Sequence, residues 1–133
     1  MSAVTLEEAH RLLRIAQADW AACAALLDAP GVRFANAAFH GQQAVEKALK
    51  AVLTVHKCDF GRTHNLVALA GQLGQTGIST PDVGELLSLL NPYAVTLRYD
   101  DIEHELMTPT ALRNVVVEMM TWAHQEVTTT AST

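Results

Sequence analysis

Residues 39–50 read Phe-His-Gly-Gln-Gln-Ala-Val-Glu-Lys-Ala-Leu-Lys and are the most informative segment of the chain. An α-helix turns by about 100° per residue, so positions three and four apart lie on the same side. One side of this helix carries polar residues: His40, Gln43, Lys47 and Lys50. The opposite side carries small and apolar residues: Phe34, Ala38, Gly41, Val45, Ala48 and Val52. The pattern predicts an amphipathic helix from about residue 33 to about residue 56.

The polar side of this helix has an ordinary interpretation. A surface helix normally turns a polar face to water, so the spacing alone indicates no function. Glu46 and Lys50 stand four residues apart, and such a pair on an exposed helix is worth only tenths of a kcal/mol. From the residues alone, we therefore favour a solvated face.

Helical signals also precede this segment. Thr5 and Glu8 have the spacing of a capping box, which predicts the start of a first helix. Its buried stripe is expected to contain Leu6, Ala9, Leu13, Ala16, Trp20, Cys23, Ala24 and Leu27. Residues 28–31, Asp-Ala-Pro-Gly, should end it, because Pro and Gly both interrupt a helix.

After the second helix, a short third helix is expected around residues 66–73. Thr80-Pro81 and Thr108-Pro109 each combine a capping residue with Pro at the first helical position, which predicts two more helix starts. Pro92 predicts a kink or restart near Asn91. The last helix should pack through Leu112, Val115, Val116, Met119, Trp122 and Ala123. We expect one helical bundle over residues 1–127 and a disordered polar tail over 128–133.

The composition agrees with an all-α fold. Half of the residues are hydrophobic but only 5% are aromatic, whereas a β-sandwich or barrel needs aromatic and β-branched strands. A chain of 133 residues is long enough for one domain with a proper core. The formal net charge of −5 gives no general attraction for nucleic acid, so any such contact requires a local basic patch.

Cys23 and Cys58 are the two cysteines, and they stand far apart without a CxxC spacing. This usage fits a reducing compartment and predicts neither a disulfide nor a zinc site. Residues 1–8 lack the basic start and apolar run of a signal peptide. No apolar stretch approaches the roughly 20 residues of a membrane span. We therefore expect a cytoplasmic protein that makes no membrane contact.

Four stretches, taken in order, resemble the HEPN domain (higher eukaryotes and prokaryotes nucleotide-binding). Ala38 and the residues 39–50 that follow it resemble the family signature Ala-Phe-His-x-Gln-Gln-Ala-x-Glu-Lys-x-x-Lys. Asp19 with residues 20–26 resembles the opening helix of the family, and Arg-Thr-His-Asn-Leu at residues 62–66 resembles its connection into the third helix. The fourth match lies in the tyrosine and Arg-Tyr-Asp-Asp elements of residues 93–101. The resemblance spans roughly residues 8–127.

The resemblance implies an up-and-down bundle of four main helices plus a short extra helix. It also implies a homodimer, and it is strongest for the branch whose members pair with minimal nucleotidyltransferases in toxin–antitoxin-like systems. Phe39, a large apolar residue among polar ones, fits an interface between two copies. A position under a neighbouring loop fits Phe39 equally well.

The resemblance further implies a candidate active site. Many HEPN proteins are metal-independent ribonucleases that use an Arg, four to six intervening residues, and a His. Arg98 and His104 are separated by five residues, inside that window. The guanidinium would hold the scissile phosphate, and the imidazole would take the proton of a ribose 2′-hydroxyl.

Several departures count against this activity. Tyr99 follows the Arg where active toxins usually carry a small polar residue, and Leu106 stands where they often carry a Tyr. Acidic residues crowd the motif: Asp100, Asp101, Glu103 and Glu105. They would repel RNA, or an ion pair of Arg98 with one of the first two would leave His104 exposed in a loop without a catalytic role.

The function favoured by these features is a nucleotide- or partner-binding component of a nucleotidyltransferase/HEPN pair. Its expected contacts, to a nucleotide or RNA, are His40, Gln43, Lys47, Lys50 and Tyr99. The alternative is a ribonuclease toxin that uses Arg98 and His104 and is held in check by a nucleotidyltransferase antitoxin, and a third possibility is a dimeric adaptor.

No metal is expected, because no two histidines stand three or four apart on one helix. No cofactor is expected either, and the sequence contains no phosphate-cradling Gly loop. His64 and His40 have structural interpretations, as a bond to a helix end and as a polar contact between helices.

Overall fold

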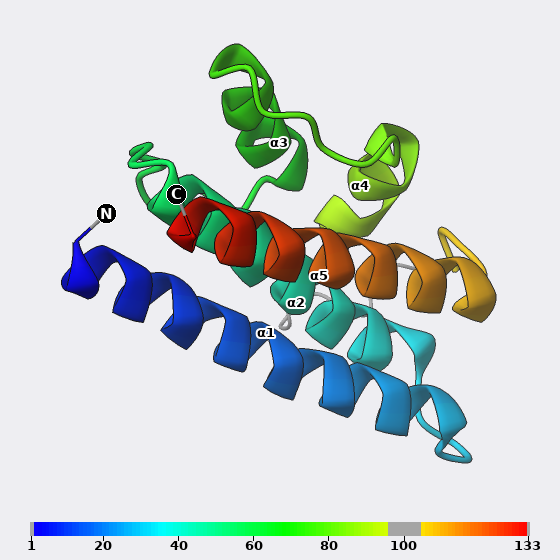
Figure 1. The fold of residues 1–133 in the computed structure, drawn as a ribbon. Helices are drawn as coiled ribbons and strands as arrows, with labels where there is room; N and C mark the ends of the chain where they lie inside the picture. Colours follow the sequence, from blue (N-terminus) through cyan, green and yellow to red (C-terminus); the bar gives the residue numbers. More distant parts are fainter. Residues whose placement is uncertain (1, 96–104, 133) are drawn as a thin grey trace.

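The structure, a computed structural model, describes residues 2–95 and 105–132. Over these residues it is built from helices alone, in agreement with the predicted all-α bundle (Figure 1). The elements in order are α1 (Ala3–Asp28), α2 (Phe34–Val55), α3 (Leu66–Gln75), α4 (Gly84–Leu90), the 3-10 helix η1 (Asn91–Ala94) and α5 (Pro109–Ala131). None of the helices described is long and apolar enough to cross a membrane.

Helix α2 is the central element of the fold. Figure 1 shows α1 and α5 lying side by side in front of it, while α3 and η1 also pack against it. Buried residues therefore occur all round α2, and they include Gln42, Glu46 and Lys50. The solvated polar face expected from periodicity is wrong at these positions, because His64 and Phe60, from the loop before α3, contact this side of the helix.

The three long helices pack tightly at Gly41. A Cβ atom there would lie 2.8 Å from Leu112 Cδ1, 3.3 Å from Val116 Cγ2 and 3.4 Å from Cys23 Sγ. The absence of a side chain thus lets α5 and α1 pack directly on the backbone of α2. Burial raises the pKa of the Cys23 thiol to about 11, so this sulfur behaves as a packing group rather than a nucleophile.

Two predicted helix starts are wrong. Ser2, not Thr5, caps α1, since Ser2 Oγ accepts a hydrogen bond from the Thr5 backbone N–H at 3.1 Å. The earlier cap adds residues to the helix and replaces the expected capping box. Helix α4 begins at Gly84 rather than Pro81, because the Pro81 carbonyl accepts a bond from Val83 N and closes a turn first.

The other signals in the second half of the chain match the structure. Thr108 caps α5 by accepting a bond from Ala111 N, and the restart expected near Asn91 is the change from α4 to η1.

Residues 128–131, expected to be disordered, instead continue α5. The buried side chain of Val127 anchors this last turn, and the Ser132 hydroxyl bonds the Thr128 carbonyl at its end.

Candidate functional site

A buried carboxylate organises the polar residues of α2. Glu46 is fully buried, and its Oε2 atom accepts hydrogen bonds from Lys47 Nζ at 2.9 Å and from Lys50 Nζ at 3.1 Å. Its Oε1 atom lies 2.9 Å from Nδ1 of His64, in the loop before α3. An unpaired carboxylate at such depth would cost several kcal/mol, so these partners are what allow the charge to be buried. We call Glu46, Lys47, Lys50 and His64 the Glu46 cluster.

The Glu46 cluster remains charged at neutral pH. Burial acts to raise the pKa of Glu46, but the hydrogen bond and charge of Lys47, with bonds from Lys50 and His64, act against it. The resulting pKa lies below its ordinary value. Two ammonium groups and one carboxylate leave one net positive charge when His64 is counted as neutral. The cluster is therefore locally cationic in a protein whose formal net charge is −5.

Two glutamines extend the Glu46 cluster and fix the loop that carries His64. Gln42 is fully buried, and its Nε2 atom donates to the His64 backbone carbonyl at 3.1 Å. The same side chain accepts a bond of 2.7 Å from Gln43 Nε2. The backbone and the ring of His64 are thus both held by α2.

The Nδ1 atom of His64 contacts the buried Glu46 carboxylate, but 65% of the His64 side chain is exposed. A carboxylate against Nδ1 favours a proton on that atom. Nε2 then accepts a hydrogen bond when the ring is neutral and donates one when it is protonated. An imidazole oriented in this way is suited to binding an anionic oxygen or to exchanging a proton with a ligand.

A shallow hollow of about 240 Å³ adjoins His64 and is lined by His64, Asn65, Asn91 and Ala94. Asn65 caps α3 by accepting a bond from Ala68 N at 3.1 Å. Asn91 donates to Asn65 Oδ1 at 3.0 Å and accepts from the N–H of Leu66 at 2.8 Å. These bonds make the walls of the hollow a fixed polar surface where α3 meets η1.

The structure divides the four residues predicted on one polar side of α2. Gln43, Lys47 and Lys50 lie around Glu46, but Lys50 is only 8% exposed and packs over the Phe60 ring at 5.4 Å. Lys50 is therefore mainly a buried counter-charge, whereas Lys47 and Gln43 are partly exposed.

His40 lies apart from the Glu46 cluster, with its Nδ1 atom 3.0 Å from Asp19 Oδ1 of α1. This is the polar contact between helices that its structural interpretation expected. The ring of Phe39 meets His40 edge-on at 5.2 Å and is partly exposed, so no neighbouring loop fully covers it.

Sequence reasoning missed three members of this site: Gln42, Glu46 as its centre, and His64. A usable signal was present, since Gln42, Glu46 and Lys50 follow one another at intervals of four along a single line of the helix. Nothing local to α2 could reveal His64, which stands 18 positions after Glu46.

The predicted catalytic residues Arg98 and His104, and the predicted ligand contact Tyr99, lie outside the described residues. The chain on either side of them is joined by a bond of 3.1 Å from the N–H of Leu106 to the hydroxyl of Tyr93. Burial raises the pKa of Tyr93, which keeps this acceptor a neutral phenol. Within residues 2–95 and 105–132, no three His, Cys, Asp or Glu side chains are grouped to hold a metal ion.

Comparison with known proteins gives one match. Residues 9–126 match the family model described as HEPN domain, a range that runs from α1 into α5 and contains the Glu46 cluster and the adjoining hollow. A search of curated proteins and a search of solved structures each found no match.

Proposed function

The chain belongs to the HEPN family, and from that premise we propose that it is the nucleotide-binding component of a nucleotidyltransferase/HEPN pair. In this proposal the phosphate of a nucleotide occupies the hollow beside His64. The partner nucleotidyltransferase is supported by the resemblance of the sequence to the paired branch of the family.

The main support for the proposal is the excess positive charge beside the exposed imidazole of His64. Lys47 and Lys50 together outweigh the charge of Glu46. His64 contacts Glu46 and also lines the hollow. Arg62, exposed two residues before His64, adds a further cation. A phosphate at Nε2 would favour the protonated ring, which can donate to Glu46 and to the ligand at once.

Calorimetric titration with ATP tests the ligand. His64→Asn retains a donor near the position of Nδ1 for Glu46 and removes Nε2, while Lys47→Gln removes the excess charge. Each variant should weaken binding about tenfold, as expected for the loss of a charge-assisted hydrogen bond. Lys57→Gln is the matched control, because Lys57 is exposed just after α2 and outside the cluster. The affinity of Lys57→Gln for ATP should stay within about twofold of the wild-type value, since an exposed charge outside the cluster is largely screened.

Co-expression with a nucleotidyltransferase encoded beside the protein tests the partner. A complex that copurifies through ion exchange supports the pair. If the wild-type protein binds no ATP at millimolar concentration, alone or in that complex, the nucleotide-binding proposal is wrong.

A further inference from the structure

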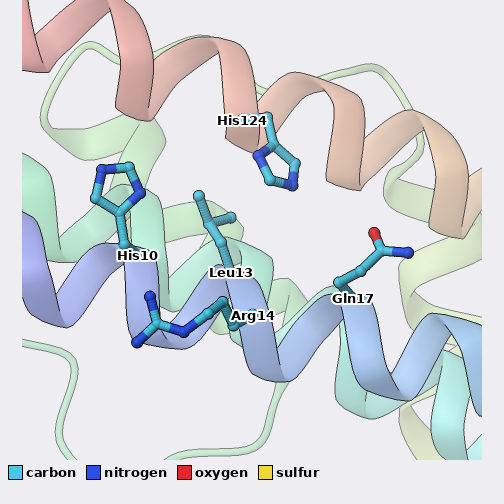
Figure 2. A pocket seen from close by; sticks show the side chains of 5 residues that line it. All are labelled: His10, Leu13, Arg14, Gln17 and His124. Carbon is cyan, nitrogen blue, oxygen red and sulfur yellow. The ribbon is translucent and has the colours of Figure 1, made fainter.

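A second site lies between α1 and α5, and five side chains that line it are drawn in Figure 2. None of them belongs to the Glu46 cluster. One hollow of about 260 Å³ is lined by His10, Leu13, Arg14, Gln17 and His124. A neighbouring hollow of about 150 Å³ is lined by Gln17, Trp20, Val117, Met120, Thr121 and His124. Because Gln17 and His124 line both, the two hollows form one cleft, which we call the α1–α5 cleft.

The two ends of the α1–α5 cleft differ in chemistry. One end combines a guanidinium with two imidazoles, from Arg14, His10 and His124, and among the described residues no acid lines it. The other end is largely apolar, with the indole of Trp20, Met120 and Val117, whose side chain is 45% exposed. The cleft thus offers donors for an anion beside a surface for a planar or apolar group.

The polar groups of the cleft are unused in the described part of the chain. Arg14, His10 and His124 make no hydrogen bond or ion pair there. The same helices pair their other arginines: Arg11 bonds Glu8 at 2.8 Å, and Arg113 bonds Asp28 at 2.6 Å. The cationic end of the cleft therefore lacks the counter-charge that its neighbours have.

We propose that the α1–α5 cleft binds a small organic anion that carries a planar ring. The phosphate or carboxylate of the ligand lies among Arg14, His10 and His124, and the ring packs against Trp20. Ligand pockets begin at about 300 Å³. Neither hollow reaches that volume alone, but the two share Gln17 and His124 and together are large enough for a small molecule. A metal ion is a poorer fit, because the described residues place only two histidines here. This inference is independent of nucleotide binding, since the cleft shares no residue with the hollow beside His64.

The fluorescence of Trp20 gives a direct assay. Trp122 is the only other tryptophan, and Trp122→Phe leaves Trp20 as the single indole while keeping an aromatic ring at the second position. Phenyl phosphate and benzoate carry both the anion and the ring and should change the emission saturably at millimolar concentration. Inorganic phosphate lacks the ring and phenol lacks the anionic group. Both should bind about tenfold more weakly than phenyl phosphate.

Two variants on α1 identify the site. Arg14→Gln should weaken phenyl phosphate binding about tenfold. Arg11→Gln, the matched control three residues away, removes an exposed guanidinium that is bound to Glu8 and should change the affinity by less than about twofold. Both positions are exposed, so both variants should fold.

Three results would overturn the proposal. The first is no saturable response to phenyl phosphate or benzoate, and the second is an equal loss of affinity in Arg14→Gln and Arg11→Gln. The third is a Trp20 signal that responds to protein dilution but not to the ligands, which would assign the cleft to an interface between copies.

Discussion

Glu46 Oε1 lies 2.9 Å from Nδ1 of His64, and this contact joins a fully buried carboxylate to a largely exposed imidazole. It links the interior of α2 to the surface where α3 meets η1. A change in the charge of Glu46 must therefore affect both the stability of the bundle and the orientation of the ring. Denaturation by urea and by acid tests the effect on stability.

Replacing Glu46 by Gln should destabilise the protein by about 3 kcal/mol, because breaking a buried ion pair leaves the other charge uncompensated. Lys50 would keep its charge at 8% exposure without the carboxylate. Urea denaturation followed by circular dichroism measures the change. Glu8→Gln, which breaks the exposed pair with Arg11, is the control and should have almost no effect. Equal midpoints for the two variants would contradict the structural role of Glu46.

Acid should weaken the fold through the same carboxylate. The pKa of Glu46 in the folded protein is below its ordinary value of 4.5, so the unfolded chain takes up the proton at a higher pH than the folded chain. The stabilisation is thus complete above about pH 4.5 and is lost as the pH falls through the folded pKa. When denaturation is measured from about pH 7 down to about pH 3, Glu46→Gln should lose less stability than the wild type. An identical pH dependence in both proteins would refute this.

Gly41→Ala should destabilise the bundle by about 1–3 kcal/mol, the usual cost of overpacking a core. The new methyl group would lie 2.8 Å from Leu112 Cδ1, and either the buried Leu112 side chain or α5 itself would have to shift. Gly71→Ala is the matched control in α3, since its Cβ would meet nothing within 4 Å. It should stabilise the protein by about 0.5–1 kcal/mol through the better helix propensity of Ala. Thermal melts of the pair test the packing, and a neutral Gly41→Ala would show that α5 is not so close.

How much of this could be predicted from sequence depends on what each pattern encodes. The bounds of α2 and the cap at Thr108 follow from local signals, and both agree with the structure. Periodicity assigned Lys50 to a polar side but could not say what covers that side, because the covering residues come from the loop before α3. The prediction placed the cap of α1 at Thr5 instead of Ser2, because both residues offer a capping hydroxyl and they stand one turn apart.

The homodimer expected from the family resemblance stays a prediction, and its test is direct. Light scattering at micromolar concentration should give about twice the chain mass of 14.4 kDa. Phe39→Ser should shift the protein toward monomer if this partly exposed ring lies in the interface. Val4→Ser removes another exposed apolar residue and serves as the control. A wild-type monomer would remove any cleft shared between two copies.

Ribonuclease activity is the remaining alternative from the sequence, and we expect the purified protein not to cleave RNA. If cleavage is seen, Arg98 and His104 should carry it, and the products should end in 2′,3′-cyclic phosphate. His104→Ala should then lower the rate of cleavage about 10²–10⁴-fold. Arg98→Lys should also lose cleavage, because an ammonium cannot reproduce the two-point contact of a guanidinium. Undiminished cleavage by His104→Ala would indicate another site or a contaminant.

A nuclear magnetic resonance titration of the ¹⁵N-labelled wild-type protein with ATP shows whether a nucleotide binds beside the Glu46 cluster. We expect the largest shift changes at the His64 imidazole and at the amides of Asn65 and Asn91. In His64→Asn, the changes at these two amides should require about tenfold more ATP. Saturable changes centred on any other part of the bundle, or no changes at millimolar ATP, would contradict the proposal.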